Sequence, residues 1–120
     1  MRVHAIRGAT TCDEDTRSEI VDKTRALISE IVARNELALE DVISVILTAT
    51  DDLRAEFPAA GARAAGLVGV PLLGARELSV DGSLPRCIRV MVHCYSDRAR
   101  DELRHVYLDG AATLPRELPE

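Results

Sequence analysis

One stretch limits what this chain can fold into more than any other: RCIRVMVHCY, residues 86–95, which contains neither glycine nor proline. Such an alternating run predicts a strand. Both of its faces are largely apolar, and a strand of that kind needs cover on both sides, from helices or from another subunit, so we predict that it is central. Because successive side chains point to opposite faces, one face carries Arg86, Ile88, Val90, Val92 and Cys94, and the other carries Cys87, Arg89, Met91, His93 and Tyr95.

Arg89 places a positive charge on this strand. In a central strand its guanidinium would be mostly buried, and an unpaired buried charge is strongly destabilising. We therefore expect a carboxylate beside Arg89, or a ligand that supplies one.

Length and composition indicate one domain, residues 1–120, in which 47% of the residues are hydrophobic. There is no long uncharged apolar run and no basic segment followed by an apolar one, so we expect no membrane-spanning helix, no signal peptide and a cytoplasmic location. The cysteines are odd in number and lack C-x-x-C spacing, which favours reduced structural thiols over disulfides or a zinc site. They are Cys12, Cys87 and Cys94.

The charged residues argue against nucleic acid as a partner, because the net charge is −5 and no block of lysine and arginine is present. Of 15 basic residues only Lys23 is a lysine. Arginine binds planar carboxylates through two parallel hydrogen bonds, although genomic composition is the simpler explanation of its excess, since alanine is abundant too.

The first elements are a strand and a helix. Residues 3–6 predict a short strand that runs into Arg7 and Gly8, where glycine allows a tight turn, so we expect Arg7 at a strand end. The sequence TRSE at 16–19 is a capping box, and the apolar residues after it fall on one helical stripe. This pattern predicts a helix over 16–35.

The rest of the chain completes an α+β fold. We predict a turn at 39–41, a second central strand at 42–48, a loop or helical turn at 50–53, a helix at 58–66 ended by Gly66, an edge strand at 70–77 with Pro71 near its start, a turn at 81–82 and an exposed helix or helical turn at 97–108. The two prolines in 115–120 predict a mobile tail. This order predicts a mixed β-sheet with helices on one face, and the two-faced apolar strand favours a homo-oligomer.

Common catalytic patterns are missing from the sequence. It has no Ser-His-Asp order, no glycine-rich phosphate loop and no histidine pair at metal spacing. His93 and Cys94 are neighbours but point to opposite faces of a strand, so we predict no metal site. Cys87 has no base nearby in the sequence that would activate a nucleophile, and we interpret it as a small buried residue.

A set of polar residues remains near the ends of the predicted elements: Arg7, Arg63, Glu77, Arg89 and Tyr107. Each of them, taken alone, is more often a surface residue or half of a salt bridge. A structural ion pair between Glu77 and Arg89 is the main alternative to a functional role. Together the five residues describe a pocket for a compact acid that bears a hydroxyl group.

Several motifs resemble one known family. They are Ile6–Thr10, Phe57–Ala59, Val70–Leu72 with Glu77, Cys87–Met91 and Arg104–Leu108. In this order and spacing, over residues 1 to about 114, they resemble the monofunctional chorismate mutases of the trimeric, pseudo-α/β-barrel type. The resemblance implies an isomerase that converts chorismate to prephenate in phenylalanine and tyrosine biosynthesis, without a cofactor or metal, in sites between neighbouring subunits of a homotrimer.

The resemblance also assigns roles to residues. It makes Arg89 the donor to the ether oxygen and to a carboxylate, makes Arg7 and Tyr107 carboxylate binders, and makes Glu77 the acceptor of the ring hydroxyl. The pocket would further be lined by Phe57, Ala59, Arg63, Leu72, Leu73, Gly74 and Leu114. Two positions depart from the family, which often has a lysine where Ala60 stands and a thiol or hydroxyl where Gly74 stands.

Two alternatives stay open at this stage. A non-catalytic regulatory domain that binds an amino acid could use the same arginines, and so could a trimeric imine-hydrolysing protein of similar architecture. The sequence also leaves open whether Arg63 or Arg116 reaches the substrate. A concerted rearrangement needs no nucleophile and no proton shuttle, so the missing catalytic patterns agree with a mutase.

Overall fold

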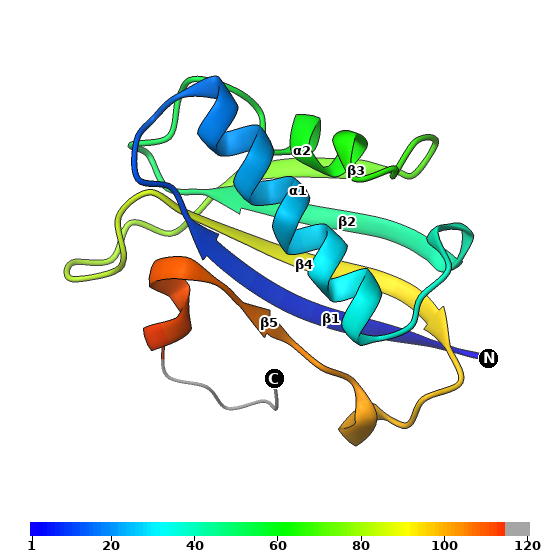
Figure 1. Cartoon of the computed structure of the whole chain (residues 1–120). Coiled ribbons are helices and arrows are strands. Elements are labelled where there is room, and N and C mark those ends of the chain that lie inside the picture. The colour runs from blue at the N-terminus through cyan, green and yellow to red at the C-terminus, as the bar shows by residue number, and fades with distance from the viewer. Residues whose placement is uncertain (115–120) are drawn as a thin grey trace.

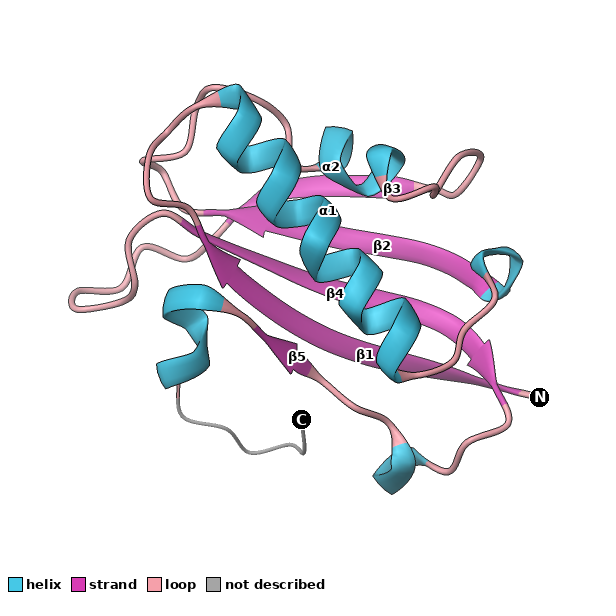
Figure 2. Cartoon of the chain, viewed as in Figure 1, coloured by secondary structure: helices cyan, strands magenta, loops and turns pink. Residues whose placement is uncertain are grey.

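Residues 1–114, the part of the chain that this computed structural model describes, form a five-stranded mixed sheet with two α-helices on one face (Figures 1 and 2). The predicted tail at 115–120 lies outside the described residues. The strand order is β3-β2-β4-β1-β5. The sheet confirms the predicted α+β class, with helices on one face of a mixed sheet.

The elements have these bounds: β1 Arg2–Thr11, α1 Arg17–Arg34, a 3₁₀ turn Leu39–Asp41, β2 Val42–Ala49, α2 Ala59–Ala64, β3 Leu72–Arg76, β4 Cys87–Ser96, a 3₁₀ turn Arg100–Glu102, β5 Val106–Tyr107 and a 3₁₀ turn Asp109–Thr113. Strand β4 is antiparallel to both β1 and β2. The outer pairs, β2 with β3 and β1 with β5, are parallel.

Strand β4 is the centre of the sheet, as its sequence predicts, with two strands on each side. The side chains of Ile88, Val90, Val92 and Cys94 are buried beneath the helices. Val90, Val92 and Cys94 pack with α1 and β2 into the main core, whose fully buried members include Ile6, Leu27, Ile28, Ile31, Val45, Leu47 and Val92, whereas Ile88 packs in a smaller cluster with Cys12, Ile20 and Leu53. Only one face of the sheet is covered in this way, and we call the other the open face.

Helix α1 begins and ends where the sequence predicts. The Thr16 hydroxyl accepts a hydrogen bond from the Glu19 backbone N–H at 3.2 Å, which satisfies a donor that the first turn leaves unpaired. At the other end Asn35 is buried, and its side chain exchanges two hydrogen bonds with the backbone of Arg104, at 2.7 and 2.8 Å. The helix is thereby fixed to the segment that leads into β5.

Strand β1 is longer than predicted, and the expected turn at Gly8 is wrong. Arg7 consequently lies within the strand and not at its end. Glycine is needed at this position for space: a Cβ on Gly8 would lie 2.9 Å from both the Ile31 side chain and the Val106 carbonyl oxygen. The glycine that the sequence analysis interpreted as a turn residue instead allows α1 and β5 to lie close to β1.

The segment 97–108 meets its expectation only in part. Its charge density predicted an exposed helix or helical turn, and the structure has one exposed 3₁₀ turn, Arg100–Glu102, while the rest of the segment is not helical. Leu103, His105, Val106 and Tyr107 are buried. They are buried because this segment lies along the edge of β1 and ends in β5, a strand that the sequence analysis missed.

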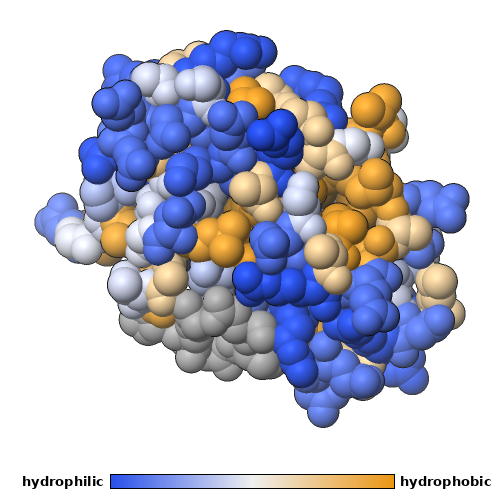
Figure 3. Space-filling view, viewed as in Figure 1, coloured by the Kyte–Doolittle hydropathy of each residue, from blue (hydrophilic) through white to orange (hydrophobic). Residues whose placement is uncertain are grey.

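The two sides of the molecule differ in polarity. Seen from the helices, the surface is largely hydrophilic, with apolar groups gathered toward the end where α2 is followed by its loop (Figure 3); Val68 in that loop is 80% exposed. The open face instead exposes large apolar side chains along its strands, among them Ile46, Leu73 and Tyr95. Neither described helix is long and apolar enough to cross a membrane.

Candidate active site

Strand register brings the predicted polar residues together on the open face. Tyr107 lies beside Ala9, Ala9 beside Arg89, and Arg89 beside Thr48, so these residues form one row across four strands. Arg7 lies beside Met91 in the next row. Paired residues on neighbouring strands point to the same face of a sheet, so all these side chains project from the side that lacks helices.

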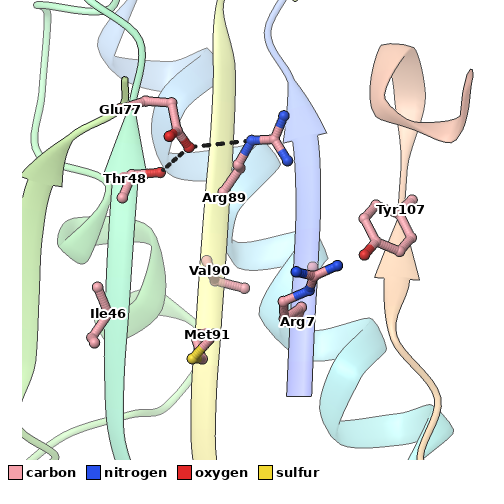
Figure 4. A pocket seen from close by; sticks show the side chains of 9 residues that line it. Arg7, Ile46, Thr48, Glu77, Arg89, Val90, Met91 and Tyr107 are labelled. Atoms are coloured by element: carbon pink, nitrogen blue, oxygen red, sulfur yellow. Dashed lines mark hydrogen bonds and ion pairs between the residues drawn. The ribbon is translucent and has the colours of Figure 1, made fainter. Parts of the chain in front are cut away.

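This part of the open face is hollow, with a cavity of about 240 Å³ (Figure 4). Figure 4 looks onto the cavity with the helices behind the strands, and it shows Arg89 between Glu77 and Arg7. The lining residues are Arg7, Gly8, Ile46, Thr48, Glu77, Arg89, Val90, Met91 and Tyr107. A cavity of this size is smaller than most small-molecule sites, which occupy roughly 300–1,000 Å³.

The Glu77 carboxylate holds Arg89 at the edge of the cavity. Its Oε1 lies 3.2 Å from Nε of Arg89 and accepts a hydrogen bond from the Thr48 hydroxyl at 2.9 Å. Its Oε2 accepts from the Leu78 backbone N–H at 3.0 Å. In Figure 4 the two terminal nitrogens of Arg89 point away from Glu77, toward β1. They are placed to donate to a molecule in the cavity.

The structure confirms the carboxylate expected beside Arg89 but corrects its setting. The Arg89 side chain is 43% exposed and that of Glu77 is 23% exposed in the single chain, because no helix covers this face. An ion pair this exposed contributes about 0–1 kcal/mol to stability. Stability alone is therefore a weak reason for the pair.

Arg7 and Tyr107 form the other side of the cavity. The Arg7 backbone N–H donates to Nδ1 of the buried His105 at 2.9 Å, which joins β1 to the segment before β5. Figure 4 shows the Tyr107 hydroxyl directed toward the Arg7 guanidinium. Two guanidinium groups and one carboxylate thus give the cavity a net positive charge in a chain whose net charge is −5. An anion is the ligand that this arrangement favours.

Cys87 lies two residues before Arg89 and is buried against Ala9 and Tyr107. Burial raises the pKa of its thiol above the ordinary value, and the opposing effect of the Arg89 guanidinium is smaller. A buried, protonated thiol is a poor nucleophile. All three cysteines are buried and unpaired, as the sequence predicts.

The other predicted pocket residues do not join the cavity in the single chain. Phe57, which is 76% exposed, and Gly74 line a separate hollow beside the loop after β2. Ala59 and Leu72 pack against the helix-side core, and Arg63 is exposed on α2. Leu73 is exposed on the open face at the sheet edge, Leu114 packs beside Tyr107, and Arg116 lies outside the described residues.

The sequence analysis missed several members of the cavity. Ile46 and Met91 form its apolar floor beside Thr48, Gly8 and Val90. A signal for Thr48 was available, because it is a polar residue in the largely apolar run of β2 and lies two residues from Ile46, hence on the same face. The pairing of β2 with β4, which places Thr48 beside Arg89, has no local sequence signal.

Comparisons with known proteins agree on one family. The family model described as chorismate mutase type I matches residues 3–118. The chorismate mutase AroH of Bacillus subtilis is 42% identical over 119 residues, covering 98% of this chain and 94% of that protein. The AroH of Thermus thermophilus is 45% identical over 117 residues, covering 97% and 96%. A solved chorismate mutase from Clostridium thermocellum matches with a TM-score of 0.90 and 46% identity, covering 92% of this chain and 99% of that one.

Proposed function

We propose that this chain, which belongs to the type I chorismate mutase family, binds chorismate in the cavity of the open face. It is a chorismate mutase, an isomerase of aromatic amino-acid biosynthesis. The comparisons favour neither a regulatory domain nor an imine-hydrolysing protein. The observation that carries the proposed site is the meeting of Arg7, Glu77, Arg89 and Tyr107 in one cavity.

The chemistry of the rearrangement fits these groups. Chorismate is a dianion, and its rearrangement to prephenate breaks a carbon–oxygen bond in one concerted step, so negative charge grows on the ether oxygen. A fixed cation at that oxygen stabilises the transition state more than the ground state. We assign this role to Arg89, whose terminal nitrogens point into the cavity while Nε is paired with Glu77.

The remaining groups hold the substrate in a reactive geometry. Arg7 and Tyr107 bind a carboxylate, and Glu77 accepts a hydrogen bond from the ring hydroxyl. Anchoring the flexible enolpyruvyl side chain over the ring accelerates the reaction, because the bound substrate has already lost the conformational entropy that the free substrate loses on reaching the transition state. The apolar floor of Ile46 and Met91 supports this arrangement by keeping water from the reacting atoms.

We propose further that the site is completed between subunits of a homotrimer, in which the sheets form a pseudo-α/β-barrel. The support is twofold: the cavity of the single chain is small, and the open face exposes Ile46, Leu73 and Tyr95. In the trimer a neighbouring subunit closes the cavity. The residues we assign to that closing surface are Phe57, Ala59, Arg63, Leu72, Leu73 and Gly74, and we place Leu114 on the Arg89 side, beside Tyr107.

Mixed trimers test this arrangement. We expect Arg89→Ala and Arg63→Ala chains to be inactive alone and to regain activity when unfolded together and refolded in equal amounts. If neighbouring subunits share each site, about a quarter of the sites receive both intact residues. The matched control mixes Arg89→Ala with Arg7→Ala chains. Both of these residues line the cavity of the same subunit, so no site in the mixture contains both intact and no activity should return. A fully active monomer by light scattering at micromolar concentration would contradict the proposal.

We also propose that the enzyme works in the cytoplasm. Its biosynthetic role and its three unpaired cysteines support a reducing compartment.

A further inference from the structure

Thr48 is a polar residue within the apolar run of β2, and its side chain lies on the open face beside Arg89. Its hydroxyl donates to Oε1 of Glu77 at 2.9 Å, the same oxygen that pairs with Arg89 (Figure 4). A carboxylate only accepts hydrogen bonds when ionised, so the direction of this bond is fixed. Thr48 has no assigned role in the reaction described above.

The two hydrogen bonds and the ion pair of Glu77 leave little room for further donors at its carboxylate. An ionised carboxylate offers about four lone-pair sites, two on each oxygen. The Thr48 hydroxyl donates to Oε1, which also lies 3.2 Å from Arg89 Nε in the ion pair, and the Leu78 backbone N–H occupies one site of Oε2. One site on Oε2 is left for the ring hydroxyl of the substrate. The orientation of the carboxylate therefore determines both its ion pair with Arg89 and its contact with the ring hydroxyl of the substrate.

A competing geometry exists for this ion pair. Arginine and carboxylate groups frequently pair through two parallel hydrogen bonds, which would engage Nε and one terminal nitrogen of Arg89. The contact in the structure is instead between Nε and Oε1, and the terminal nitrogens point away from Glu77, toward β1. A carboxylate held from outside by Thr48 and by the Leu78 backbone is not free to turn into the two-bond arrangement.

We propose that Thr48 is a positioning residue for the rearrangement. Its hydroxyl holds Glu77 in a single contact with Arg89, and so keeps the terminal nitrogens of Arg89 available to the ether oxygen. The proposal rests on the function proposed above for Arg89 and Glu77. It assigns Thr48 an effect on kcat that is transmitted through Glu77, without requiring contact between Thr48 and the substrate.

Two substitutions separate the hydroxyl from the shape of the side chain. Thr48→Val removes the hydroxyl and keeps a β-branched residue suited to a strand, and Thr48→Ser keeps the hydroxyl. We expect Thr48→Val to lower kcat by about 10- to 100-fold with KM changed by less than about 3-fold, since a hydrogen bond to a charged group is lost. Thr48→Ser should stay within about 3-fold of the unchanged enzyme in both constants.

A matched control removes a threonine hydroxyl elsewhere. The hydroxyl of Thr24 is buried in α1 and has no hydrogen-bond partner among the described residues. Thr24→Val should therefore keep kcat. Melting temperatures of all variants, measured at one protein concentration, separate loss of folded enzyme from loss of rate.

A double substitution shows whether the effect passes through Glu77. In a Glu77→Ala background, Thr48→Val should cause no further loss of kcat. The proposal is wrong if Thr48→Val keeps kcat, if Thr48→Ser loses as much as Thr48→Val, or if Thr48→Val acts equally with and without Glu77. Arg89→Gln distinguishes this failure from failure of the proposed site, because an active Arg89→Gln enzyme would overturn the site itself.

Discussion

Replacing Arg89 by glutamine gives the most direct test of the site, because the structure predicts different sizes for its effects on stability and on rate. The ion pair with Glu77 joins side chains that are 43% and 23% exposed, with 3.2 Å between Nε and Oε1. Exposed pairs of this kind contribute about 0–1 kcal/mol. We therefore expect Arg89→Gln to lower the free energy of unfolding by less than about 1 kcal/mol.

The effect on rate should be much larger. Loss of one preorganised donor typically costs about 10²- to 10³-fold in kcat, or roughly 3 to 4 kcal/mol, and Arg89→Gln removes a charge as well. Arg89→Lys should recover little, because an ammonium group cannot contact Glu77 and the substrate through one rigid plane. The loss should appear in kcat itself, beyond any rise in KM, since the interaction strengthens as charge develops.

The assay follows the disappearance of chorismate at several concentrations, so that kcat and KM are obtained separately, alongside thermal unfolding at a fixed protein concentration. Arg25→Gln is the control: Arg25 pairs with Asp22 on the surface of α1 at 3.4 Å, and its loss should change neither quantity. Glu77→Gln tests the structural alternative. If Arg89→Gln and Glu77→Gln lower the melting temperature together and leave kcat intact, the pair is structural and the catalytic assignment is refuted.

Two further predictions concern the fold around the site. Gly61→Ala should destabilise the protein by about 1–3 kcal/mol, because the added Cβ would lie 2.5 Å from Cβ of Thr24, and the better helix propensity of alanine offsets only part of this cost. The control Gly74→Ala, whose surroundings are open, should keep its melting temperature; an unchanged melting temperature in Gly61→Ala as well would show that α1 and α2 are not packed so closely. His105 should make the protein less stable in acid. Burial, and secondarily the charge of Arg7, lowers the pKa of His105 in the folded protein below 6.5. As the pH falls below 6.5, the unfolded chain therefore binds a proton at this residue before the folded chain does, which favours unfolding. The melting temperature should therefore drop between about pH 6.5 and pH 5, and more steeply than in His105→Asn; equal slopes would refute this role.

The sequence predicted the central strand and the long helix because their signals are local. Alternation over residues 86–95 is complete within β4, and the capping residue Thr16 contacts its own helix. The polar residues of the site were also recognisable, since Arg89 needed a partner and Glu77 provides it.

The rest depended on contacts between distant parts of the chain. Gly8 resembles a turn residue, but its role is to admit Ile31 and Val106, which lie far away in the sequence. The charged residues around Arg100 resemble an exposed helix, and only the available edge of β1 explains why Val106 forms a strand instead. Thr48 was missed because its partnership with Arg89 depends on strand register.

The strand register also determines the order in which the fold can form during synthesis. Strand β1 is made first, yet Arg2 pairs with Ser96 and Gly8 with Val106, so both of its neighbours leave the ribosome last. The β2–α2–β3 unit, in contrast, is continuous in the sequence. Closing long loops costs entropy before the distant contacts form, which slows folding. We therefore expect the sheet to assemble from its β2–β3 edge. Strand β1, although it is synthesised first, should be the last to pair with its neighbouring strands.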